Sequence, residues 1–358
     1  MMNRRTLIAR SAAFLAAPAV KAQPAPGLRA LAKSKGFHYG TATANYQREV
    51  ESFSAALTRE AGILVAEYES KRDLIEPGQG QFDFSATDAL LNYAQSNAMA
   101  FRFHPLVWYA ANPPWLEQAV LTTKRESLHT GYVERLMRRY RGRFHSVDVV
   151  NEAIYPEDGR SDGLRNCFWL KAFGPSYIDN AFHAARAADP SAMLVYNDWG
   201  CEAGDAQNDI FRKLTLNFLD GLIKRGVPLD AYGMQGHLDA FAHPVDQKKL
   251  AAFLYDLKAR GLKILVTELD VLDNTGPSDV ALRDKAVADA TRRFLDVVLG
   301  NSATVAVLTW GLSDRFLEPA GRREAVLKGA PRRLPLDRAM QRKAMWTAMA
   351  KSFADRRA

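Results

Sequence analysis

The hydrophobic pattern of the chain consists of short, nearly continuous apolar runs, separated by segments whose apolar residues recur at helical spacing. The runs are rich in Val, Ile and Leu. This composition is typical of strands that are buried on both faces, because β-branched side chains pack well on a pleated surface. We predict eight such strands, at residues 37–43, 62–69, 100–108, 146–153, 192–199, 231–239, 264–271 and 304–313.

Eight strands that alternate with helices predict an α/β fold with a single (β/α)8 barrel. A helix around 181–188 is expected to end at Asp189-Pro190, because the residue before a proline disfavours helical geometry. An open, doubly wound sheet is the alternative. It is disfavoured because no glycine-rich phosphate-binding loop follows any of the predicted strands.

Two of the predicted strands deliver a glutamate at the same end. The run 146–153 reaches Asn151 and Glu152, and the run 264–271 reaches Glu268. A carboxylate at the end of a buried strand is costly to desolvate unless it is hydrogen-bonded, paired or used. A single such glutamate would more often cap a helix or pair with an arginine, but its recurrence on two strands favours catalysis.

Polar and aromatic residues gather at the carboxyl ends of the strands, where (β/α)8 enzymes place their active sites. Carboxylates, amides, imidazoles and indoles suit sugar recognition, and paired carboxylates hydrolyse glycosides. Serine-triad and zinc hydrolases are disfavoured, because the chain has neither a Gly-x-Ser-x-Gly nor a His-Glu-x-x-His motif. The strand-end residues are Glu67, Glu69, Lys71, His104, Trp108, Asn151, Glu152, Asn197, Asp198, Trp199, Gln235, His237, Glu268, Asp270, Trp310 and Asp314.

Residues 1–22 have the pattern of an export signal. Arg4 and Arg5 precede a short apolar stretch, and Val20-Lys21-Ala22 offers a small-residue cleavage site, as in a twin-arginine signal. We therefore expect a periplasmic or secreted protein whose residues 23–358 form one catalytic domain. A disordered basic tail is the alternative for this segment.

Charge and cysteine content add little to this interpretation. Loss of residues 1–22 would lower the formal net charge from +8 to +4, which is ordinary for a soluble protein, and no basic stripe or motif indicates a nucleic acid partner. No later segment indicates a membrane partner, and we expect a monomer. Cys167 and Cys201 could form one disulfide in an exported protein, or remain two separate thiols.

Several motifs, in order and about one per strand, resemble those of glycoside hydrolase family 10, the retaining endo-β-1,4-xylanases of the (β/α)8 type. The resemblance runs from about Phe37 to about Met349. Its carriers are Glu76-Pro77, Gly80-Gln81-Phe82-Asp83-Phe84, His104-Pro105-Leu106-Val107-Trp108, Pro114-Trp115-Leu116, Val147-Asp148-Val149-Val150-Asn151-Glu152-Ala153, Tyr196-Asn197-Asp198, Gly233-Met234-Gln235-Gly236-His237, Thr267-Glu268-Leu269-Asp270 and Trp310-Gly311-Leu312-Ser313-Asp314-Arg315.

The resemblance implies that Glu152 is the general acid/base and Glu268 the nucleophile of a reaction that needs no cofactor and no metal. Retention requires the two carboxyls to lie about 5–5.5 Å apart, with one protonated and one ionised. Burial against Trp108 or a neighbouring anion would keep the acid protonated, and His237 would keep Glu268 ionised. Asn151 would bond the sugar 2-hydroxyl. The residues implied to bind the sugar on the non-reducing side are Glu67, Lys71, His104, Gln235 and Trp310.

The chain departs from the family pattern around this sugar. The usual Asn and Trp after the second strand are Tyr68 and Arg72, a sugar-binding Gln is Ala111, the usual Tyr after Asn-Asp is Trp199, and a second Trp falls at Glu318. We predict an endo-1,4-β-xylanase that acts on xylan or xylo-oligosaccharides. The alternatives are the same retaining chemistry on another β-glycoside, such as a β-glucan or a glycosylated metabolite, and a weakly active sugar-binding relative.

Overall fold

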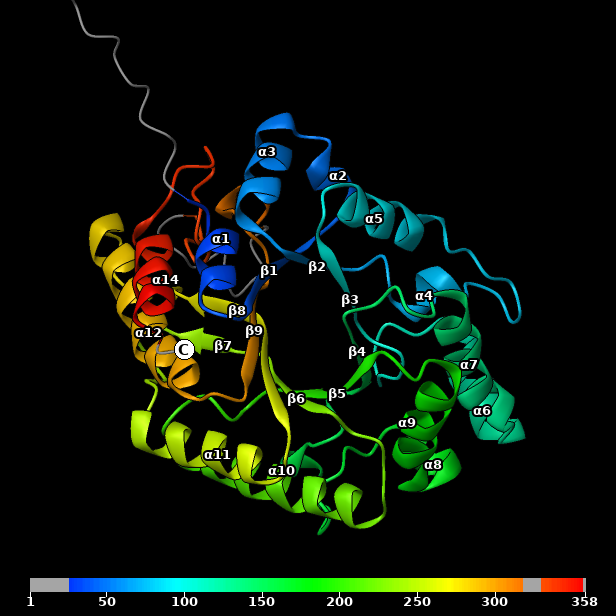
Figure 1. The fold of residues 1–358 in the computed structure, drawn as a ribbon. Coiled ribbons are helices and arrows are strands. Elements are labelled where there is room, and N and C mark those ends of the chain that lie inside the picture. Colours follow the sequence, from blue (N-terminus) through cyan, green and yellow to red (C-terminus); the bar gives the residue numbers. More distant parts are fainter. Residues whose placement is uncertain (1–25, 318–329, 357–358) are drawn as a thin grey trace, which may run out of the picture.

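The computed structural model describes residues 26–317 and 330–356, and within these it shows a closed parallel barrel (Figure 1). The strands run in the order β6-β5-β4-β3-β2-β1-β9-β8, and β6 pairs with β8 to close the ring. The predicted (β/α)8 barrel is confirmed. The expected signal at 1–22 and Glu318 lie outside the described residues. The strands are β1 (His38–Thr43), β2 (Ile63–Ala66), β3 (Ala100–Phe103), β4 (Ser146–Asn151), β5 (Met193–Asp198), β6 (Ala231–Met234), β8 (Lys263–Leu272) and β9 (Thr304–Thr309).

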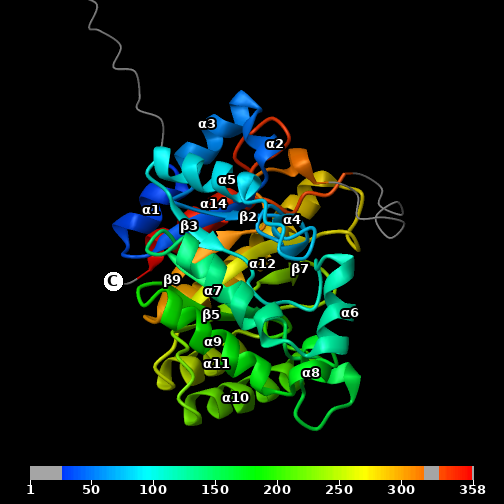
Figure 2. The ribbon, with the colours of Figure 1, turned by 90° about the vertical axis from the view of Figure 1, so that its right-hand side faces the viewer.

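The helices form a ring outside the strands (Figures 1 and 2). The helix α9 ends at Ala188, as the following Asp189-Pro190 predicts. None of the helices in the described part of the chain is long and apolar enough to cross a bilayer. The helices are α1 (Leu28–Ser34), α2 (Asn45–Arg48), α3 (Glu51–Glu60), α4 (Arg72–Ile75), α5 (Ser85–Ser96), α6 (Pro114–Thr123), α7 (Thr130–Arg139), α8 (Phe168–Phe173), α9 (Ser176–Ala188), α10 (Ala206–Lys224), α11 (Gln247–Ala259), α12 (Val280–Gly300) and α14 (Ala344–Asp355).

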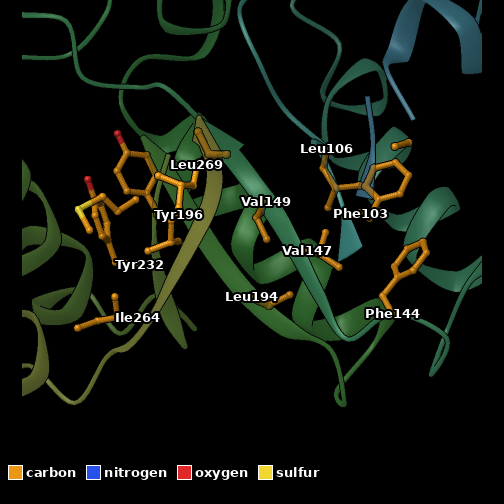
Figure 3. Close-up of a cluster of buried hydrophobic side chains, with 14 of the residues drawn as sticks. Phe103, Leu106, Phe144, Val147, Val149, Leu194, Tyr196, Tyr232, Ile264 and Leu269 are labelled. Atoms are coloured by element: carbon orange, nitrogen blue, oxygen red, sulfur yellow. The ribbon is translucent and has the colours of Figure 1, made fainter. Parts of the chain in front are cut away.

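Two apolar layers hold the barrel together. Between the strands and the helices lies the larger layer, to which Val147, Leu194 and Ile264 belong (Figure 3). The smaller layer fills the barrel interior and includes Ile63, Val65, Val195 and Leu265. The strands are therefore buried on both faces. Each fully buried aliphatic side chain contributes roughly 1.5–3 kcal/mol to the stability of the fold, so the barrel is a rigid support for the residues at the carboxyl ends of its strands.

Two predicted strands are interrupted in the structure. The run 231–239 divides into β6 and the short β7 (His237–Asp239), because Gly236 between them has a φ of +82° and turns the chain. The run 100–108 leaves the sheet after Phe103. Pro105 has no N–H for a ladder bond, and the pairing with β4 resumes only at Leu106 and Val107, whose N–H groups donate to the Asp148 and Val149 carbonyls. Both breaks turn strand-end side chains toward the barrel mouth.

Of the two alternatives for the cysteines, the disulfide is not formed in this structure, because both Cys167 and Cys201 are free thiols. Cys201 is buried, and its sulfur accepts a hydrogen bond from the Tyr232 hydroxyl at 3.6 Å. Cys167 is only partly buried, at the start of α8. The alternative of two separate thiols is therefore the one observed.

Candidate active site

Glu152 lies directly after β4 with a backbone φ of +56°, in the left-handed region that L-residues rarely adopt. Its backbone N–H donates to the Asn197 carbonyl at 2.9 Å, which ties this unusual conformation to β5. Its Oε1 accepts hydrogen bonds from the Asn151 amide at 3.1 Å and the Gln235 amide at 3.0 Å. The backbone and one carboxylate oxygen of Glu152 are thus both fixed.

Glu268 projects from β8 into the same barrel mouth. Its Oε1 accepts from the Asn197 amide at 2.9 Å, and its Oε2 lies 3.3 Å from His237 Nε2. The other ring nitrogen of His237 lies 2.7 Å from Asp270 Oδ1, which orients the imidazole. A chain of two amides joins the glutamates, because the Asn197 amide also donates to Asn151 Oδ1 at 2.9 Å.

The charges around Glu268 hold it in the ionised form. Burial alone would raise the pKa of Glu268, but His104, His237 and Lys71 outweigh it and lower this pKa to about 2. Burial disfavours the charged form of His237 and would lower its pKa, but Asp270 and Glu268 raise this pKa well above its usual range. The predicted contact between His237 and Glu268 is confirmed, and the site holds an ionised carboxylate suited to nucleophilic attack.

His104 follows β3 directly, lies close to Glu268 and is oriented by Asp148. Its Nδ1 lies 2.8 Å from Asp148 Oδ2 and 4.0 Å from Glu268 Oε1. Arg102 bonds the other oxygen of Asp148, and all three side chains of this group are buried. Asp148 is not among the strand-end residues that the sequence predicts. The signal was present, since Asp148 is a charged residue within an otherwise apolar strand.

Lys71 enters the site between two indoles. Its Nζ lies 4.8 Å from the ring centroid of Trp108 and 5.7 Å from that of Trp310, which are cation–π distances. Burial lowers the pKa of Lys71 to about 8, although Glu268 and other carboxylates partly oppose this. An ammonium so close to neutral titration, between two flat rings, is suited to hydrogen-bond a sugar hydroxyl.

Glu67 lies beyond Lys71, at the end of β2. Its two oxygens accept from the Gln47 amide at 2.9 and 3.0 Å. Burial, and to a lesser extent Glu69, raise the pKa of Glu67. Gln47 was missed by the sequence analysis, which took no residue from the segment after the first strand, although Gln47 lies on α2 only four residues beyond the end of β1. The predicted site residues thus gather at one end of the barrel.

The departures from the family pattern have different structural roles. Arg72 does not project as a free cation: its guanidinium pairs with Glu76 at 2.8 Å and stacks on Tyr132 at 4.0 Å from the ring centroid. Tyr68 is half-exposed, and its hydroxyl bonds Asp73. Ala111 has a φ of +49°. Arg72 therefore supports the wall of the site, whereas Tyr68 changes its exposed rim.

A cleft of about 590 Å³ opens beside Glu152 and His237. Trp199 forms part of its wall and packs on Phe211 with ring centroids 4.9 Å apart. The cleft lies on the Glu152 side of the catalytic pair, and Lys71 and Glu67 do not line it. It has the size of a small-molecule site and could hold the leaving-group side of a saccharide.

Comparisons with known proteins agree with this geometry. A model described as "Glycosyl hydrolase family 10" matches residues 27–352. "Endo-1,4-beta-xylanase 1" of Humicola insolens is 31% identical over 353 residues, which cover 96% of this chain and 77% of that protein. "Endo-1,4-beta-xylanase B" of Thermotoga neapolitana is 31% identical over 81% of this chain and 82% of that protein.

Solved structures are similar over nearly the whole fold. Native xylanase 10B from Thermotoga maritima gives a TM-score of 0.80 at 27% identity, covering 91% of this chain and 98% of that one. Xylanase 10B from Thermotoga petrophila, solved in complex with xylobiose, also gives 0.80 at 27% identity, over 92% and 98% of the two chains. The barrel, its motifs and these matches lead to one conclusion: the chain belongs to glycosyl hydrolase family 10 and is a glycoside hydrolase.

Proposed function

We propose that this protein is an endo-1,4-β-xylanase that cleaves β-1,4-xylosidic bonds of xylan or xylo-oligosaccharides with retention. One observation carries the proposal: Glu152 and Glu268 share one hydrogen-bonded amide chain at the barrel mouth. The relatives named endo-1,4-beta-xylanase and the relative solved with xylobiose support the choice of xylan. Paired carboxylates in this setting are the machinery of retaining glycosidases.

In the first step, Glu268 attacks the anomeric carbon while Glu152 donates a proton to the departing oxygen. The cations around Glu268 keep it ionised for this attack. Because Glu152 Oε1 accepts two N–H bonds, the transferable proton belongs on Oε2. The result is a covalent glycosyl-enzyme and a free leaving group.

In the second step, Glu152 takes a proton from water, and that water releases the sugar from Glu268. Asn151 bonds the 2-hydroxyl, a contact that strengthens in the transition state. Five residues are proposed to bind the sugar on the non-reducing side, with Trp310 stacking on its flat face and the others bonding its hydroxyls. These are Glu67, Lys71, His104, Gln235 and Trp310.

The altered rim supports a second candidate substrate. Tyr68 replaces an amide that would bond a sugar, and Ala111 lacks the side chain of a sugar-binding glutamine. Another β-glycoside, such as a β-glucan or a glycosylated metabolite, would use the same catalytic pair. Product analysis on glucuronoxylan, linear xylo-oligosaccharides and β-glucan separates the two, since only a xylanase releases short xylo-oligosaccharides.

The catalytic assignments are tested with Glu268→Ala and Glu152→Ala. We expect Glu268→Ala to lose turnover on all substrates. Glu152→Ala should lose far more on xylo-oligosaccharides than on activated aryl xylosides, because only poor leaving groups need protonation. Glu157→Gln, at an exposed loop carboxylate, is the matched control. Full activity of Glu268→Ala, or equal losses of Glu152→Ala on both substrate types, would refute the roles.

We also propose that the protein is exported, to the periplasm or out of the cell, and that it acts as a monomer. The support is the pattern of residues 1–22 and a site composed entirely within one chain. Cell fractionation together with the molar mass in solution tests both. A cytoplasmic product with an intact first segment, or a stable dimer, would contradict them.

A further inference from the structure

Arg165 lies on the loop between β4 and α8 and contacts both the backbone and the side chain of Glu152. Its backbone N–H donates to the Ala153 carbonyl at 2.7 Å, and its Nε donates to the Glu152 carbonyl at 2.9 Å. Its terminal nitrogen lies 3.9 Å from Glu152 Oε2. One side chain thus contacts both the left-handed backbone of Glu152 and the carboxylate oxygen that carries the transferable proton.

Two tyrosine rings hold this guanidinium in place. The Arg165 Cζ lies 4.0 Å from the ring centroid of Tyr109 and 4.2 Å from that of Tyr155. A planar guanidinium stacks well on aromatic faces, and its side chain is only 11% exposed. The charge therefore remains fixed beside Glu152, unlike that of a surface arginine. Tyr109 also lines the 590 Å³ cleft, so this stack forms part of its wall.

We propose that Arg165 is the positioning residue of the general acid/base: it holds the backbone of Glu152 and sets the upper pH limit of its acid function. The inference rests on the proposed function, because it assumes that Glu152 is the acid. A fixed cation beside Oε2 favours the ionised carboxylate. It helps Glu152 act as a base in the second step, and it limits the pH range in which Glu152 remains an acid.

Four other titratable groups of the described chain face Glu152, and all four are retained in the Arg165 variants. Lys71 faces it from the segment after β2, Tyr109 from the segment after β3 and Asp198 from β5. Glu268 lies at the far end of the amide chain. Because burial raises the pKa of Asp198 to about 8, Asp198 contributes to the basic limb of every variant, and the effect of Arg165 is the difference between its variants and the wild type.

The test compares kcat/KM against pH, on xylo-oligosaccharides, for the wild type, Arg165→Gln and Arg165→Lys. Arg165→Gln removes the cation, so the acid stays protonated to higher pH and the basic limb should move up by about one pH unit. Arg165→Lys keeps the charge but loses the stack and the planar fork. Its basic limb should stay in place while kcat/KM falls about tenfold at the optimum.

Arg160→Gln is the matched control, because Arg160 is on the same loop and pairs only with an exposed Asp162 among the described residues. It should leave the profile and the activity unchanged. A basic limb of Arg165→Gln that coincides with that of the wild type would overturn the proposal. If Arg165→Gln does not fold, Tyr155→Leu serves as the second variant, because it removes one of the two rings that hold the Arg165 guanidinium. Its basic limb should move up by less than that of Arg165→Gln. An unmoved basic limb in Tyr155→Leu would also overturn the proposal.

Failure of the proposed function gives a different result. If Glu152→Ala keeps its activity on xylo-oligosaccharides, the acid role itself is lost. If Glu152→Ala behaves as an acid variant but the Arg165→Gln limb does not move, only the role of Arg165 fails. A merely structural Arg165 would lower thermal stability in both Arg165 variants and move neither limb.

Discussion

Replacing His237 by asparagine tests the electrostatics of the proposed nucleophile. His237 is a cation in the working pH range, since Asp270 and Glu268 raise its pKa well above the usual value. Asparagine keeps a hydrogen-bond donor of similar reach but no charge. Because a depressed carboxylate pKa rises when a neighbouring cation is removed, the acid limb of the activity profile should move to higher pH.

The structure gives the size of the effect. The pKa of Glu268 falls from an ordinary 4.5 to about 2, which corresponds to roughly 3 kcal/mol in favour of the ionised form. Three groups together outweigh the opposing effect of burial, and His237 contributes both a hydrogen bond and its charge, so its loss should return at least about 1 kcal/mol. The acid limb is expected to rise by about one pH unit. Asp270 keeps Arg333 at 3.7 Å, which limits rearrangement.

The assay is kcat/KM on an activated aryl xyloside between acid and neutral pH, where protonation of the leaving group is not limiting. His243→Asn is the control, because His243 also lines the cleft but is exposed and pairs with Asp205 at 3.2 Å. Its acid limb should match that of the wild type. An unmoved acid limb in a folded His237→Asn would refute the argument that His237 holds Glu268 ionised.

Two further predictions concern the scaffold. Gly233→Ala should lower kcat at least tenfold and the free energy of unfolding by about 1–3 kcal/mol, because the added Cβ would lie 2.3 Å from Asn197 Oδ1. Steady-state kinetics and thermal unfolding check this. Gly131→Ala is the control and should stay close to the wild type, because the nearest atom to its added Cβ is the Ser127 Cβ at 3.5 Å. Glu60→Gln should lower the free energy of unfolding by about 3 kcal/mol. Burial would raise the pKa of Glu60, but donors that include Trp346 and Arg342 lower it overall, so wild-type stabilisation should be lost as the pH falls below the ordinary 4.5, whereas unfolding of the variant should depend less on pH. Wild-type-like activity of Gly233→Ala, or equal acid sensitivity of both Glu60 forms, would contradict these predictions.

The barrel could be predicted from the sequence because its strands are buried on both faces. Burial of this kind leaves an apolar run that ends where polar side chains begin. Glu152 was found in this way directly after β4, and Glu268 at the point within β8 where the run 264–266 gives way to polar residues. The break of the sixth run at Gly236 was not predicted, although Gln235-Gly236-His237 interrupts the apolar pattern and a glycine inside a strand pattern is a signal for a break. Pro105 was a readable signal for the early end of the third strand.

The partners of the site residues were harder to predict, because they come from distant parts of the chain. Asn197 was seen at a strand end but given no role, and its contacts with Asn151 and Glu268 arise only when the ring of strands closes. Gln47 and Arg165 lie outside the strands altogether. Strand patterns thus located the catalytic pair, whereas the shell that orients it required three-dimensional placement.

The far end of the barrel has a practical consequence. Lys35 Nζ donates to the Arg356 carbonyl at 3.2 Å, and the Arg356 guanidinium donates to the Thr304 carbonyl at the start of β9. Near the start of the described chain, Pro26 accepts from Arg342. These residues lie at the amino ends of the strands, opposite the cleft. An enzyme coupled to a bead or fibre through this end would present its open mouth to an insoluble polymer.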